Sequence, residues 1–310
     1  MQMSPSSPPH SQPHPYGKFP SPRTPAKYAI LLLIALAPSI LAARPSTQTA
    51  PAAPLDGTAL VRRAVQHRLD SGKTHRPMQY VIRKVDARTD STKFMIETRD
   101  GDVARLIALN GKPLSSDADK TDLARLDNLA QHPELQEHTR KNEQEETDRV
   151  NHILGLLPDA LLYQFEGMVP CPSGLCYRLS FKPNPNFTPP DIEANILTGV
   201  DGEVWIDQVQ ERLTRLDAHF IKNVEIGFGI LFKLNKGGTV SLQQANVGNN
   251  DWELTGLTIH VTGKILMLKS FSNQITEEMN HYSPVAPGLN YRDAIQLLKK
   301  YDPSQTTYTP

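Results

Sequence analysis

The only thiols of the chain are Cys171 and Cys176, five positions apart in the segment CPSGLC. A Pro-Ser-Gly turn lies between two short alternating runs here, so we expect the cysteines at the tip of a β-hairpin. In an oxidising compartment they would form a small disulfide, whose short loop limits its entropic contribution to roughly 2 kcal/mol. A redox-active pair is typically CxxC at the start of a helix, and this spacing differs.

The histidines do not form a recognisable metal or catalytic motif. His132, His138 and His152 fall in a charged, helix-periodic segment without HExxH, Glu-x-x-His or CxxC, so we assign no metal site. His260 lies on the polar side of an alternating strand, which favours a solvated or cross-strand-bonded ring. GxSxG, a glycine-rich phosphate loop and paired carboxylates on a known scaffold are also missing. We therefore predict no catalytic residue, no cofactor and no enzyme activity, although scattered Asp and His residues leave a hydrolase-like triad open.

Charge gives no reason to expect a nucleic acid partner. The 310 residues carry 33 basic and 33 acidic groups, for a formal net charge of zero. Residues 1–43 contain Lys18, Arg23 and Lys27 and no acid, so the remainder has 33 − 3 = 30 basic groups against 33 acidic ones. A body this close to neutral does not attract a polyanion.

The amino-terminal segment is typical of an exported protein. Residues 1–27 contain eight prolines and no acid, and Tyr28–Leu41 is an apolar run of 14 residues that follows Lys27 and contains Pro38. Ala42 and Ala43 follow, so residues 1–43 are interpreted as a signal peptide with a long proline-rich leader, cleaved after Ala42 or Ala43. The mature protein would be periplasmic. The alternative is an inner-membrane anchor over residues 28–43, although an anchor usually has about 20 apolar residues.

The body reads as strands with helices added. After a linker over 44–54, Asp56 is the expected N-cap of a first helix, and strands follow at Gln79–Ala87, Thr92–Thr98 and Val103–Asn110. Residues 117–158 form a charged helical insertion, Tyr291–Lys300 a last helix, and 303–310 a disordered tail, which leaves 55–302 as one domain. From Gly199 to Tyr282 an antiparallel meander is expected, with turns at Asp201-Gly202, Gly237-Gly238, Gly248-Asn249-Asn250 and Gly263-Lys264.

Alternation in this meander predicts one continuously apolar face. Asn223–Leu234 is expected to be a single strand, and Leu257–Leu268 is expected to continue the same face beyond a break at Gly263. The candidate lining residues of a ligand cavity are Val224, Ile226, Phe228, Ile230, Phe232, Leu257, Ile259, Val261 and Met267. The alternative is that these side chains form a sealed core.

Two motifs carry a resemblance to a known family. The segment from Gly202 to Asp207, GEVWID, is followed by Arg212–Leu216, RLTRL, and Asp251–Leu254 reads DWEL. Over about residues 56–282 the chain resembles the outer-membrane lipoprotein-sorting proteins of the LolA/LolB-like half-barrel type, as an uncharacterised bacterial branch. This resemblance implies an α+β fold with a strongly curved antiparallel sheet, here of about eleven strands, and helices on its concave face. The chain departs from the pattern in Thr255, in its longer insertion and in the absence of an acylatable cysteine after the signal.

The resemblance implies a carrier or sensor of the cell envelope that binds acyl chains of a lipid or lipoprotein and has no catalytic function. The helical insertion would then be a lid over the apolar lining. The alternative is an envelope scaffold that uses the charged insertion to bind a protein partner. Transient contact with a membrane surface is compatible with either function.

Overall fold

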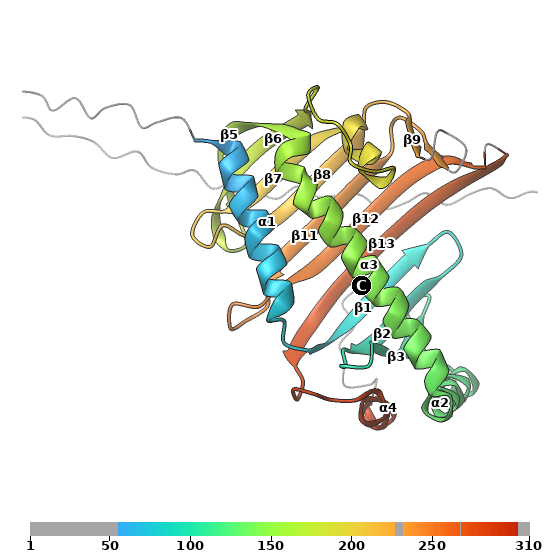
Figure 1. Cartoon of the computed structure of the whole chain (residues 1–310). Helices are drawn as coiled ribbons and strands as arrows, with labels where there is room; N and C mark the ends of the chain where they lie inside the picture. The colour runs from blue at the N-terminus through green and yellow to red at the C-terminus, as the bar shows by residue number, and fades with distance from the viewer. Residues whose placement is uncertain (1–54, 227–231, 267, 303–310) are drawn as a thin grey trace, which may run out of the picture. The chain divides into compact units, whose positions relative to one another are not determined.

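The computed structural model describes residues 55–226, 232–266 and 268–302 (Figure 1). The predicted leader, signal peptide and linker over residues 1–54 and the tail over 303–310 lie outside this part. Within it, no helix has the length and apolar composition needed to cross a membrane.

The domain is built on one antiparallel sheet, with thirteen strands in the described residues. The strands are β1 Met78–Asp86, β2 Asp90–Ile96, β3 Val103–Leu109, β4 Lys112–Pro113, β5 Leu161–Cys171, β6 Gly174–Pro183, β7 Val200–Asp207, β8 Leu213–Phe220, β9 Val224–Ile226, β10 Phe232–Leu234, β11 Thr239–Asn246, β12 Trp252–Ile265 and β13 Lys269–Pro284. Their order is β4-β3-β2-β1-β13-β12-β11-β8-β7-β6-β5, and β10 pairs with both β12 and β9. The sheet is open, and the expected α+β fold with a curved half-barrel sheet is confirmed.

Four α-helices and one 3-10 helix accompany the sheet in the described residues: α1 Gly57–Lys73, α2 Ser116–Gln131, α3 Pro133–Ala160, η1 Glu193–Gly199 and α4 Tyr291–Lys300. The Asp56 carboxylate accepts a hydrogen bond of 3.0 Å from the Ala59 amide, which is the expected cap of α1. Pro133 lies at the first position of α3, where its missing N–H costs nothing. Figure 1 shows α1 and α3 lying across the same face of the sheet.

The register of the strands fixes which side chains share this face, because residues directly opposite each other point to the same side. Val204 of β7 is opposite Leu216, Leu216 is opposite Leu242, and Leu242 is opposite Leu257. Val204 packs in the buried cluster with α1 and α3. We therefore call the face that carries this row the inner face.

A second core lies on the opposite, outer face. Val81 of β1 is adjacent to the inner-face residue Ile82, and it packs with Phe94 of β2 against α2 and α4. The buried Arg105 of β3 ties α4 down, because its Nη1 donates to the carbonyl oxygens of Leu298 and Tyr301 at 2.8 and 2.5 Å. Helices thus cover the inner face at one end of the sheet and the outer face at the other.

Three expectations about the meander were wrong. Asn223–Leu234 is not one strand, because β9 and β10 pair with each other, Val224 opposite Leu234 and Ile226 opposite Phe232. Asp201-Gly202 and Gly263-Lys264 are not turns but lie inside β7 and β12. A Cβ atom on Gly202 would lie 1.8 Å from the Asp217 oxygen, and one on Gly263 would lie 2.2 Å from the Lys233 oxygen. These glycines allow close approach of neighbouring strands. The turns at Gly237-Gly238 and after Asn246 are confirmed.

We predict that Gly202→Ala lowers the free energy of unfolding by about 2 kcal/mol or more, because the new methyl group collides with the backbone of β8. Gly155→Ala in α3 is the matched control, since its Cβ meets nothing within 4 Å. This control should raise stability by roughly 0.5–1 kcal/mol. Urea unfolding of both variants measures the difference, and equal effects would contradict the close packing of β7 on β8.

Candidate functional site

The predicted lining residues lie in different surroundings. Val224 is buried at 3% exposure and Val261 packs against the same inner core, whereas Leu257 and Ile259 are half-buried. Phe232 is 42% exposed. It lies opposite Ile226 of β9 and opposite Ile265, the last residue of β12. Phe228, Ile230 and Met267 lie outside the described residues.

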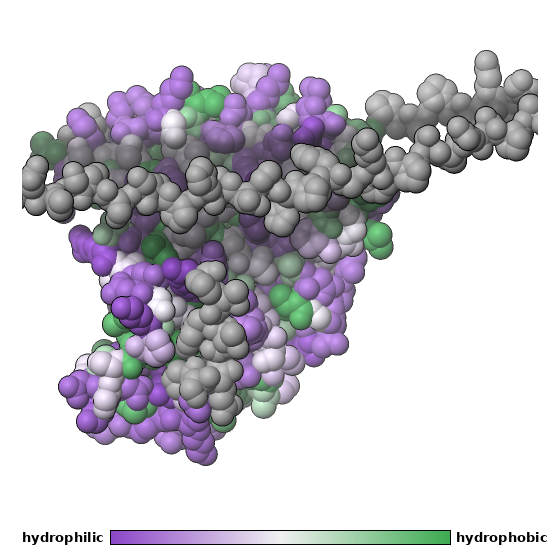
Figure 2. Space-filling model, turned by 180° about the vertical axis from the view of Figure 1, so that it is seen from behind, coloured by the Kyte–Doolittle hydropathy of each residue, from purple (hydrophilic) through white to green (hydrophobic). Residues whose placement is uncertain are grey.

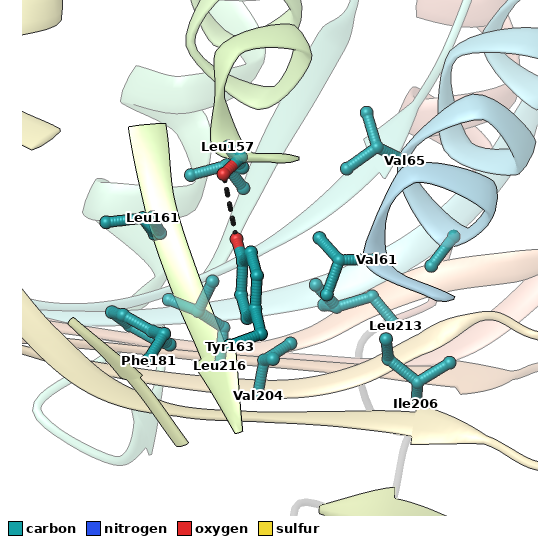
Figure 3. A pocket seen from close by; sticks show the side chains of 11 residues that line it. Val61, Val65, Leu157, Leu161, Tyr163, Phe181, Val204, Ile206, Leu213 and Leu216 are labelled. Carbon is teal, nitrogen blue, oxygen red and sulfur yellow. Dashed lines mark hydrogen bonds between the residues drawn. The ribbon is translucent and has the colours of Figure 1, made fainter. Parts of the chain in front are cut away.

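The inner face is closed beneath α1. The carboxyl-terminal end of α3 and one face of α1 pack on β5 to β8, and the Tyr163 hydroxyl donates 3.0 Å to the Leu157 carbonyl of α3 (Figure 3). The space left between these side chains is only about 10 Å³, room for about one water-sized sphere. It is lined by Val61, Ala64, Val65, Leu157, Leu161, Tyr163, Phe181, Val204, Ile206, Leu213 and Leu216. This half is a packed core.

Apolar side chains continue along the inner face from the edge of this core, where Leu216 lines the small space and Ala218 and Val240 pack against the buried cluster. One row runs from Leu216 through Leu242 to Leu257, and the next runs from Ala218 through Val240 and Ile259 to Ile275. All of these side chains are half-buried, not buried. The rows end at β13 and β1, where Lys84 and Glu277 lie opposite each other and form an ion pair of 2.7 Å. We call the two apolar rows, without this ion pair, the open rows: Leu216, Leu242, Leu257, Ala218, Val240, Ile259 and Ile275.

The middle of α3 does not seal the open rows. The helix packs mainly against α1, η1, β5 and α2, and residues 144–150 are all exposed. A helix that lies on a sheet buries side chains at every turn, so nearly two turns without a buried residue indicate a segment that stands off the sheet. Local ion pairs such as Arg149 with Glu146 at 2.6 Å satisfy its charges instead.

The amino-terminal half of α3 is attached by polar contacts. Gln136 donates to the Asp100 carbonyl at 3.0 Å, and the Glu143 carboxylate accepts from the Asp102 amide at 3.1 Å. The Asp102 carboxyl lies beside Glu143 and Glu97. Burial, followed by these two charges, raises the pKa of Asp102 to about 8. Burial also raises the pKa of Glu143.

Further acidic groups extend this cluster at the base of β1. His75 bonds Glu97 at 2.6 Å and lies 3.5 Å from Glu253, and the Glu97 hydrogen bond raises the pKa of His75. Burial raises the pKa of Glu253 to about 7. Protonation of the Asp102 carboxyl relieves its repulsion with Glu143 at the point where α3 meets the sheet.

The remaining titratable groups that were considered from sequence have local roles. Cys171 and Cys176 form the expected disulfide at the β5–β6 turn, which is confirmed. His152 bonds Asp191 at 2.6 Å, His132 and His138 bond residues of their own helical turn, and His260 is exposed. In the described ranges, the one cluster of metal-ligand side chains is Cys171, Cys176 and Asp207, and its two sulfurs are bonded to each other.

Sequence reasoning missed five members of the open rows: Leu216, Ala218, Val240, Leu242 and Ile275. Each was visible as an apolar residue in an alternating run, but its face depends on pairing partners from other strands. The contact of Glu143 with Asp102 joins positions 41 residues apart and has no local sequence signal.

Comparisons with known proteins show low similarity. No protein-family model matches the chain, and no curated protein matches its sequence. Among solved structures, a DUF1329 family protein from Desulfovibrio piger is similar over 78% of this chain and 100% of its own, with 12% identity and a TM-score of 0.29. An outer membrane lipoprotein-sorting protein domain from Vibrio parahaemolyticus is similar over 77% of this chain and 100% of its own, with 9% identity and a TM-score of 0.23. TM-scores this low carry no argument about either the fold family or the function of this chain.

We predict that Asp102→Asn makes stability less dependent on pH. The folded pKa of about 8 exceeds the ordinary value of 3.8, so the wild-type protein loses stability as pH rises from about 4 through 8. The amide cannot ionise and should raise the unfolding free energy at pH 8.5 by roughly 1–2 kcal/mol.

The control is Asp86→Asn, because backbone hydrogen bonds from Arg88 and Thr89 lower the pKa of Asp86. This variant should not gain stability at pH 8.5. Thermal unfolding between pH 4 and pH 9 measures both variants, and an Asp102→Asn protein with the pH profile of the wild type would contradict the burial of Asp102 beside Glu143.

Proposed function

We propose that this chain is a non-catalytic binding protein for the acyl chains of a lipid or lipoprotein, which lie on the open rows beneath α3. The observation that carries the proposal is the half-burial of the open rows under a helix whose middle is exposed on all sides. Covering an exposed aliphatic surface with an apolar partner removes it from water and lowers the free energy of the system.

An unbranched hydrocarbon suits this surface. The longer row crosses β8, β11, β12 and β13, about 14 Å at the usual strand spacing. Their side chains offer no hydrogen-bonding group, so a ligand with none loses nothing by binding there. Each methylene removed from water contributes about 0.8 kcal/mol before the cost of ordering the chain.

The closed half of the inner face cannot hold such a chain as it is packed. Its space of about 10 Å³ compares with about 300–1,000 Å³ for typical ligand pockets. Entry there would require α1 and α3 to separate from β5 to β8 and would disrupt many apolar contacts. Displacing the amino-terminal half of α3, which is held by Gln136 and Glu143, would cost less free energy than separating α1 and α3 from β5 to β8.

An envelope location is part of the proposal. The disulfide is typical of exported proteins, and the predicted signal peptide over residues 1–43 leads to the same compartment. A carrier or sensor there meets lipids and lipoproteins as ligands.

A second candidate function is a protein-interaction module. The exposure of residues 144–150 favours it, because a charged helix surface that faces solvent is available to another protein. Charge reversal of Glu145 and Asp148 should then abolish partner capture and leave acyl-chain binding unchanged.

We predict that Leu257→Gln weakens the binding of a fluorescent long-chain fatty acid by about tenfold, because it places an amide in the middle of the open rows. Thr258→Gln is the matched control. Its side chain is the next along β12 and points to the outer face, so binding should be unchanged.

Fluorescence titration measures both affinities, and urea unfolding verifies that both variants fold. A wild-type protein that takes up no fatty acid, and yields no lipid on extraction, would refute the proposal. Equal loss in the two variants would place the ligand elsewhere.

A further inference from the structure

The hairpin of β12 and β13 ends in exposed leucines. The turn is closed by the Leu268 amide, which donates 3.1 Å to the Ile265 carbonyl. Leu266 is 55% exposed and Leu268 is 90% exposed. Figure 1 shows this hairpin, the longest of the sheet, narrowing to a point at its turn.

Leu266 occupies a conformation that a leucine does not favour. Its φ is +51°, in the left-handed region, where an L side chain costs about 1–2 kcal/mol. The other non-glycine residues with positive φ in the described ranges are Asn110, Asn249, Asn250, Glu211 and His281, all of them polar. Asparagine or glycine is the usual choice in such a turn. A leucine held in this strained conformation with more than half of its surface exposed points to a function of the side chain.

Basic residues surround the two leucines. Lys264 and Lys269 are exposed on either side of the turn, and Phe232 of β10 lies opposite Ile265. The Glu225 carboxylate of β9 is paired with Lys233 of β10 at 3.3 Å. We call this set the hairpin tip: Phe232, Lys264, Ile265, Leu266, Leu268 and Lys269.

We propose that the hairpin tip is a membrane-docking site that inserts Leu266 and Leu268 into the surface of a bilayer with anionic headgroups. The exposed leucines at the turn match the acyl-chain boundary of a bilayer, and the flanking lysines match the layer of phosphate headgroups. A stable protein–protein interface needs more than about 1,000 Å² of buried surface, which the turn of a two-stranded hairpin does not offer.

The tip also leads to the site proposed above. Along β12, Leu257, Ile259, Val261, Gly263 and Ile265 alternate on one face, so a continuous strip joins the open rows to the turn. This connection rests on the proposed function and would place the tip where an acyl chain leaves the bilayer. Membrane docking itself does not depend on it.

The test is co-sedimentation of the purified exported protein with vesicles of phosphatidylcholine containing 30% phosphatidylglycerol. The Leu266→Asn, Leu268→Asn double variant should partition about tenfold less. Val209→Asn is the matched control, because Val209 is 86% exposed in the distant turn after β7 and should have no effect. Lys264→Gln with Lys269→Gln should lower binding to anionic vesicles about fivefold for each lysine and binding to pure phosphatidylcholine much less.

The melting temperature of the single Leu266→Asn variant is an internal control, because it should change in the opposite direction to vesicle binding. Asparagine tolerates the left-handed conformation, so this variant should melt a few degrees higher than the wild type while it binds vesicles more weakly. A binding loss caused by unfolding would instead lower the melting temperature.

Three results would overturn the proposal: a wild type that does not sediment with vesicles, a double variant that sediments as the wild type does, or a dimer in analytical ultracentrifugation that the double variant abolishes. The last would assign the tip to contact with a second copy. Measuring fatty acid uptake from water by the double variant separates membrane docking at the tip from acyl-chain binding on the open rows. A double variant with normal uptake and lost docking supports the tip as a separate site. A wild type that docks on vesicles but takes up no fatty acid contradicts the open rows alone.

Discussion

The structure depends on the pairing register that places Val204 of β7, Leu216 of β8, Leu242 of β11 and Leu257 of β12 in one row, next to the register shifts at Trp205/Ile206 and Gln243/Gln244. A slip of one residue anywhere along it would turn the apolar rows outward. Because the register holds, one face of the sheet is aliphatic across its centre, while the other carries groups such as Arg215 over the Trp205 ring. Seen from the outer side, the surface not covered in grey is mostly hydrophilic (Figure 2).

Helices cover this two-faced sheet unevenly. The inner core with α1 and the outer core with α2 and α4 lie at opposite ends, so each stabilises a different group of strands. The centre of the inner face is left to α3, whose exposed middle carries i,i+3 pairs such as Arg149 with Glu146. Such pairs contribute only about 0.3–0.5 kcal/mol each, so the segment over the open rows is the part of the fold most easily displaced.

Local signals in the sequence were sufficient for the fold class, the cap at Asp56 and the disulfide. They failed where neighbouring strands decide the outcome. Gly202 and Gly263 were interpreted as turns, although each serves as a close approach between strands, and the apolar period of residues 223–234 concealed a hairpin. For the site, Leu257 and Ile259 were identified by alternation, but their partners Leu242 and Ile275 follow only from the register. The strain at Leu266 is a backbone property that no residue pattern reveals.

The most direct test of the account is methyl NMR of the protein with a fatty acid that carries a nitroxide on its hydrocarbon chain. We expect paramagnetic broadening of the methyl groups of Leu216, Leu242, Leu257, Ile259 and Ile275, with Val103, Ile107 and Ile295 of the outer core unaffected. Broadening of the outer core, or no broadening of the open rows at saturating fatty acid, would contradict the assignment of the inner face as the binding surface.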